Sequence, residues 1–77
     1  MYNSQITHDR IMTELQRQNK TAKTMCADLG LGVNAVHQMA HMAMGFRSST
    51  LYAIADYLDV SADYLLGRTD NAESHKL

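Results

Sequence analysis

The clearest alternation of apolar and polar positions lies in the stretch 21–39, on either side of Gly30. Apolar residues recur there three or four positions apart, the spacing of one helical face, at Ala22, Met25, Cys26, Leu29, Val33, Val36 and Met39. Thr21 is a favourable N-cap for the first run, and Gly30 suits a helix end that requires positive φ. The pattern predicts helices over 22–29 and 33–43, joined by a tight turn.

A helix is also predicted upstream of this pair, from Ser4 or Thr7 to about Gln18. Its expected core positions are Ile11 and Leu15, with Met12 beside them. The charged residues expected to face water are Arg10, Glu14 and Arg17, and the first two are spaced for a weak ion pair. Asn19 tolerates positive φ and suits the end of this helix.

Two more segments with helical spacing follow Arg47. The first begins at the cluster 48–50, runs to about residue 58, and has its apolar positions at Leu51, Ile54, Ala55 and Leu58. The second lies between the N-cap Ser61 and the terminating Gly67, with Asp63 in its first turn. Residues 68–77 have no periodicity, so we expect one domain over 1–67 and a flexible tail over 68–77.

The composition favours helix over sheet and one small domain over several. The chain has 77 residues and no proline, and Ala, Leu, Met and Gln are abundant. No apolar run is long enough to span a membrane and the start lacks a signal-peptide core, so we expect a cytoplasmic protein. The single Cys26 cannot form an internal disulfide and is expected to be a buried core residue.

The charges are unevenly distributed along the chain. The net charge is −1, which argues against a general binder of polyanions. Residues 15–50 are mildly basic, whereas residues 51–77 are acidic. The basic part can face phosphates, and the small number of cations predicts a modest electrostatic contribution to DNA affinity.

The polar face of the helix over 33–43 carries side chains suited to base edges. Its candidates for base contact are Asn34, His37, Gln38 and His41, with Val33 placed to touch a thymine methyl. Asn and Gln pair a donor with an acceptor, which matches adenine, and His donates to guanine. Two helices joined by a tight turn, with the second one exposed at its start, indicate a helix-turn-helix.

From Ile11 to Asp70 the chain resembles the lambda-repressor/Cro-type helix-turn-helix family, also called the XRE family. The segments that carry the resemblance are LGLGVNAV at 29–36 and LYAIADYLDVSADYLLGRTD at 51–70. It implies an all-α, five-helix, lambda-repressor-like DNA-binding domain, and a transcriptional regulator that reads an operator through the helix over 33–43. It also implies phosphate contacts at Thr21, Ala22, Lys23, Arg47, Ser48 and Ser49.

The expected partners are a double-stranded DNA operator and a second copy of the chain. One helix-turn-helix unit reads only part of a site, so a homodimer is expected, with Tyr57, Tyr64 and Leu66 at its interface. No cofactor or metal is expected, because His37 and His41 make only two ligands. No nucleophile lies beside a base and no phosphate-binding loop is present, so an enzyme is not expected.

A protein-interaction module on the same fold, such as an adaptor or an antirepressor, is the alternative. The segment 40–46, AHMAMGF, lacks the cations that the family usually carries there, and this favours the adaptor. The family also places glutamine where Ala22 stands. The polar face with Asn34, His37 and Gln38 favours DNA.

Overall fold

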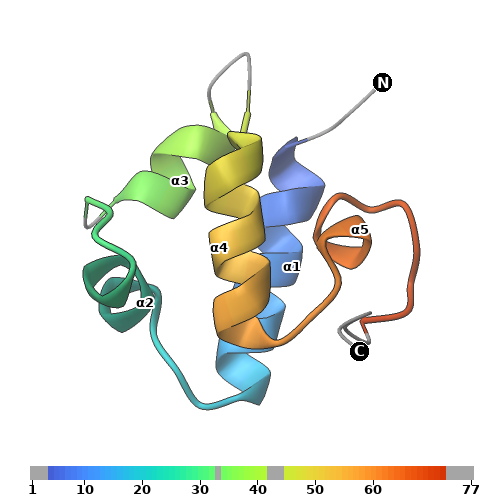
Figure 1. Cartoon of the computed structure of the whole chain (residues 1–77), viewed down its shortest axis with the longest axis horizontal. Coiled ribbons are helices and arrows are strands. Elements are labelled where there is room, and N and C mark those ends of the chain that lie inside the picture. Colours follow the sequence, from blue (N-terminus) through green and yellow to red (C-terminus); the bar gives the residue numbers. More distant parts are fainter. Residues whose placement is uncertain (1–3, 33, 42–44, 73–77) are drawn as a thin grey trace.

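Five α-helices make up the regular structure of the residues that the structure describes (Figure 1). The computed structural model describes residues 4–32, 34–41 and 45–72, and no strand occurs among them. The helices are α1 (Ser4–Arg17), α2 (Ala22–Asp28), α3 (Ala35–Ala40), α4 (Ser48–Leu58) and α5 (Ala62–Leu65). The all-α prediction is therefore confirmed, and no described helix is long and apolar enough to cross a membrane.

Helices α1 and α4 form the centre of the domain, and the shorter helices flank them (Figure 1). α3 and α5 both pack against α1, on opposite sides of the centre in this view, and α2 packs against α3. α5 also contacts α4. The described chain measures 30 × 29 × 20 Å along its principal axes. Helices α2 and α3 lie together at one end of the longest axis (Figure 1).

Four of the helices end in the same way. After α1, α2, α4 and α5 the chain passes through a residue with positive φ, at Asn19, Gly30, Asp59 and Gly67. In each case two backbone N–H groups turn back to carbonyls of the last helical turn, for example from Leu31 to Cys26 at 2.7 Å. These paired bonds satisfy carbonyls that the helix end leaves without partners. The chain therefore turns after each of these four helices while the last carbonyls of the helix keep hydrogen-bond partners.

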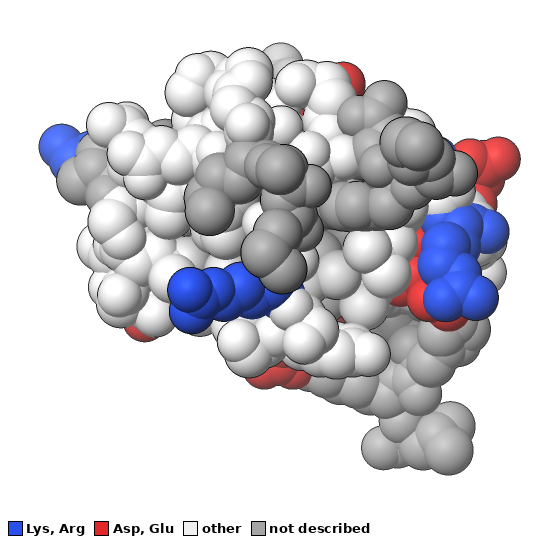
Figure 2. Space-filling view, turned by 90° about the horizontal axis from the view of Figure 1, so that it is seen from above, with Lys and Arg blue, Asp and Glu red and all other residues white. Residues whose placement is uncertain are grey.

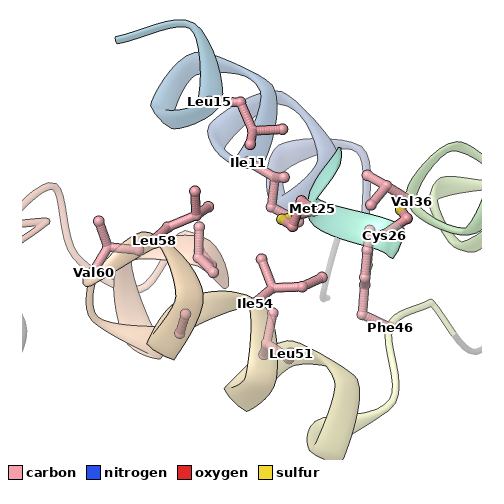
Figure 3. Close-up of a cluster of buried hydrophobic side chains, with 12 residues drawn as sticks. Ile11, Leu15, Met25, Cys26, Val36, Phe46, Leu51, Ile54, Leu58 and Val60 are labelled. Atoms are coloured by element: carbon pink, nitrogen blue, oxygen red, sulfur yellow. The ribbon is translucent and has the colours of Figure 1, made fainter. Parts of the chain in front are cut away.

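The apolar face of every helix contributes to one core (Figure 3). The buried cluster contains Ile11, Leu15, Met25, Cys26, Val36, Phe46, Leu51, Ile54, Ala55, Leu58, Val60 and Leu65. The side chains of Ile11, Met25 and Ile54 point toward one another from α1, α2 and α4 (Figure 3). Cys26 is buried, as predicted, whereas Met12 is 40% exposed and lies outside the core.

Glu14 is buried, contrary to the prediction that it faces water. Only 1% of the residue is exposed, and both of its carboxylate oxygens accept hydrogen bonds from the Arg17 guanidinium at 2.6 and 2.7 Å. These hydrogen bonds raise the pKa of Arg17. The ion pair in α1 is thus formed by residues three apart, rather than by Arg10 and Glu14.

Arg10 instead holds the chain that follows α5. Its guanidinium donates to the backbone oxygens of Tyr64 and Thr69 and to the carboxylate of Asp70. The backbone N–H of Ser61 donates to the oxygen of Ala72 at 3.0 Å. Residues 69, 70 and 72 therefore contact the helical domain, and residues 73–77 lie outside the described residues. The flexible tail over 68–77 stays a prediction.

Candidate nucleic-acid interface

The start of α2 is fixed by its N-cap. The Thr21 hydroxyl accepts a hydrogen bond from the backbone N–H of Thr24 at 3.2 Å and donates to the Thr24 hydroxyl at 2.9 Å. Ala22 is half-buried against the core, whereas Lys23 is exposed. Of the three phosphate-contact candidates here, Thr21 and Lys23 face solvent. The buried side of α2, at Met25 and Cys26, fixes which face remains outside.

The turn between α2 and α3 depends on Gly30. Its φ is +72°, a conformation that costs an L side chain free energy, and a Cβ placed there would meet nothing within 4 Å. The requirement for glycine is therefore conformational rather than steric. Leu31, which follows it, packs against the core.

α3 begins later than the sequence predicts, with Asn34 as its N-cap and Ala35 as its first helical residue. It reaches Ala40, with His41 as its C-cap. The base-contact candidate Val33 and the predicted helical residues 42–43 lie outside the described residues. The six-residue helix still turns Val36 and Ala40 into the core.

The remaining base-contact candidates share the outer face of α3. Asn34, His37, Gln38 and His41 are all exposed, while Val36 behind them is buried. The Asn34 side chain makes no capping hydrogen bond to the helix. An exposed amide can offer a donor and an acceptor to one base, which is the geometry of adenine recognition. This face therefore presents hydrogen-bonding groups without any fixed charge.

His8 of α1 lies beside this face, although it was not among the predicted site residues. The ring centroids of His8 and His37 are 5.9 Å apart, and those of His37 and His41 are 4.8 Å apart. The sequence gives no sign of the first contact, because His8 and His37 come from different helices. No group of three or more His, Cys, Asp or Glu in the described part of the chain is placed to hold a metal ion.

The start of α4 carries the other phosphate-contact candidates. Arg47 is the N-cap residue and makes no side-chain capping bond, and Ser48 and Ser49 form the first turn. All three are exposed, and no acidic residue lies in that turn. Figure 2 shows the domain from above, where Lys and Arg side chains form a few separate patches and one of these patches adjoins acidic side chains. The cations available to phosphates are therefore sparse, as the charge distribution predicted.

The candidates for a dimer interface are partly covered within the chain. Tyr57 and Tyr64 are half-buried against the core, as is Leu66. The Lys20 ammonium lies 4.8 Å from the Tyr57 ring centroid, and the Arg10 guanidinium lies 4.4 Å from that of Tyr64. The Tyr57 hydroxyl donates to Asp28 at 3.0 Å, and burial together with this bond raises its pKa.

The chain matches no protein-family model, no curated protein and no solved structure. The family resemblance of its sequence therefore stays a prediction. The arrangement of α2 and α3, and the side chains exposed on α3, carry the functional argument.

Proposed function

We propose that this protein is a sequence-specific DNA-binding transcriptional regulator, acting as a repressor in the cytoplasm, with a lambda-repressor-like helix-turn-helix. The observation that carries the proposal is the exposed face of α3, where four uncharged hydrogen-bonding side chains lie opposite a buried apolar side. In this reading α3 enters the major groove, where each base pair presents a distinct pattern of donors and acceptors. α2 crosses behind it and sets its direction.

The positions of the exposed cations support the same reading. Lys23 in the first turn of α2 and Arg47 at the start of α4 flank α3 in the chain, and both are exposed. Such cations position a protein on the phosphate backbone, whereas contacts to base edges specify the sequence. We therefore assign positioning to Lys23 and Arg47, together with Thr21, Ser48 and Ser49, and sequence reading to α3.

Selection from a random duplex library is the direct test of this function. The purified chain is expected to enrich one sequence with approximate twofold symmetry, which it then binds more tightly than scrambled duplexes at the same salt concentration. Recovery of no common sequence after repeated rounds, together with no retention on mixed DNA at low salt, would contradict the proposal.

The salt dependence of binding tests the role of Arg47. At about 0.9 per neutralised phosphate, three to four contacts give a log–log slope of roughly −3 per subunit. Arg47→Ala is expected to make this slope shallower by about 0.9, since one contact is lost. The control is Arg68→Ala, because Arg68 is exposed beside Asp63 and is not a predicted contact. An unchanged slope for Arg47→Ala would remove this residue from the interface.

We also propose that two copies bind one operator through α5 and the end of α4. Leu66→Glu is expected to weaken binding to the symmetric duplex while circular dichroism stays helical, because a charge at the interface opposes pairing. Tyr52→Glu is the control, since Tyr52 on α4 is 65% exposed and outside the proposed interface. Light scattering with and without the duplex gives the stoichiometry. One copy per duplex at saturation would rule out the dimer.

A protein-interaction adaptor is the second candidate, and a specific observation favours it. Residues 29–46, which include all of α3, contain no Lys, Arg, Asp or Glu. A surface without fixed charge gains little from counterion release, which dominates non-specific DNA binding. If the chain fails to bind DNA at low salt but forms a complex with another helical protein, the adaptor replaces the regulator.

A further inference from the structure

Three histidines from two helices form a histidine cluster, His8, His37 and His41, on the outer side of the α1–α3 contact. Their rings meet edge to face, with centroid separations of 5.9 Å between His8 and His37 and 4.8 Å between His37 and His41. The two helices are held in this position by their packing and by the Ser4 hydroxyl, which donates to the Ala40 carbonyl at 2.9 Å. The contact therefore belongs to the fold and not to a loop.

Asp9 supplies a negative charge at the α1 end of the cluster. Its carboxylate oxygen lies 3.2 Å from Nδ1 of His8 and accepts a hydrogen bond from the Gln5 amide at 3.0 Å. The hydrogen bonds from Gln5 and His8 lower the pKa of Asp9, so this carboxyl group remains ionised around neutral pH. Asp9 therefore places a negative charge directly beside the His8 ring.

The other charged groups on neighbouring elements have partners of their own or lie on α2 and α4. On α1, Arg17 pairs with Glu14, and Arg10 holds the segment after α5. On the elements packed against α1 and α3, the charged residues are Lys23, Asp28, Asp56 and Asp63, with Arg47 as the N-cap of α4. Asp28 accepts from Tyr57, and Asp63 lies 4.0 Å from Arg68.

Histidines are the side chains of α3 that can carry a positive charge. Residues 29–46 contain no Lys, Arg, Asp or Glu, so a positive charge on a side chain there can come only from His37 and His41. His8 adds a third imidazole from α1, beside His37. Phosphates near such rings stabilise their protonated forms and are neutralised by them.

We propose that the histidine cluster makes DNA binding proton-linked: the complex takes up protons at His8, His37 and His41, and affinity for DNA increases as the pH falls. This inference rests on the proposed DNA-binding function. It adds regulation by pH, and it adds His8 to the residues of the candidate nucleic-acid interface. Protonated histidines supply the cations that α3 otherwise lacks. A fall in pH therefore adds positive charge to this face and strengthens its overall attraction to the DNA polyanion, whatever the base sequence.

Binding of a labelled mixed-sequence duplex at two pH values tests the proposal. Uptake of one proton raises the association constant about tenfold per pH unit, so binding at about pH 6 should be at least about tenfold tighter than at about pH 7.5. The log–log salt slope should also steepen by about 0.9 for each additional phosphate neutralised. Circular dichroism at both pH values checks that the fold is the same.

Histidine-to-glutamine variants assign the effect to the cluster. H37Q/H41Q should lose most of the pH dependence, and adding His8→Gln should remove the rest. Because His37 and His41 are exposed, the double variant keeps the test valid even if His8→Gln unfolds the domain. His75→Gln is the control and should retain the full effect.

The outcomes separate this inference from the function on which it rests. Binding that is independent of pH in the unmodified protein would overturn the proton linkage and leave the DNA-binding proposal standing. An equal pH dependence in the triple variant, or its loss in His75→Gln, would overturn the assignment to the cluster. No binding at either pH would contradict both.

Discussion

Replacing Ile54 with alanine is expected to destabilise the domain by about 2–5 kcal/mol, because it opens a cavity in the core. Ile54 is 0% exposed and lies in the middle of α4, opposite Ile11 and Met25 (Figure 3). Domains are typically stable by only about 5–15 kcal/mol, so the variant should be substantially unfolded at moderate urea. Urea denaturation followed by circular dichroism gives the free energy of unfolding.

Tyr52 provides the matched control for this experiment. It lies two positions earlier on α4 and is 65% exposed, so Tyr52→Ala should change the free energy of unfolding by no more than about 0.5 kcal/mol. Equal decreases in the free energy of unfolding for the two variants would mean that α4 does not bury the face that carries Ile54.

Replacing Gln38 with alanine is expected to weaken binding to the selected operator by about 1–3 kcal/mol. This corresponds to an increase in the dissociation constant of about five- to 150-fold. Gln38 is exposed on the outer face of α3, and its amide can pair with one base. Loss on scrambled duplexes should be much smaller, because those complexes depend on phosphate contacts. Fluorescence anisotropy on both duplexes gives the two free energies.

Gln16→Ala is the control, because it makes the same substitution at another exposed glutamine. Gln16 lies near the C-terminal end of α1 and is not a predicted DNA contact, so its replacement should leave both affinities unchanged. If Gln38→Ala lost as much on scrambled DNA as on the operator, Gln38 would not specify sequence.

The ends of α1, α2, α4 and α5 could be predicted best, because each depends on a few consecutive residues. Those of α3 could not, since it was predicted over 33–43 and spans Ala35–Ala40. Thr21 and Ser61 each accept the backbone hydrogen bond expected of an N-cap. Asn19, Gly30 and Gly67 have the positive φ that their residue types favour. Apolar spacing likewise identified the buried side of α4 at Leu51, Ile54, Ala55 and Leu58.

Long-range contacts of polar side chains could not be predicted in this way. Arg10 looked like a partner for Glu14 because helical neighbours are the only pairs visible in a sequence, yet its partners lie 54 to 60 residues away. The partner of the buried Glu14 carboxylate is Arg17, three positions later on α1. Met12 shows the related error for apolar residues, since its position next to Ile11 does not place it on the same face.

For the candidate site, the sequence predicted which residues of α3 are exposed but not what lies beside them. The outer face follows from the period of the helix, since Val36 and Met39 were predicted on the opposite, apolar face. Val36 is buried and Met39 packs against the core. The approach of His8 depends on how α1 packs against α3. The cations over Tyr57 and Tyr64 likewise come from distant parts of the chain.

The contacts of Arg10 also bear on how the protein forms during its synthesis. Arg10 is synthesised before the residues that it binds, and Asp70 follows it by 60 residues. At about 5–20 residues per second, that interval is on the order of several seconds. Throughout this time Glu14 and the apolar face of α1 lack most of the groups that surround them in the folded domain. Its packing must therefore be completed after translation of the last helix, and a nascent chain paused before that point would expose α1 to chaperones.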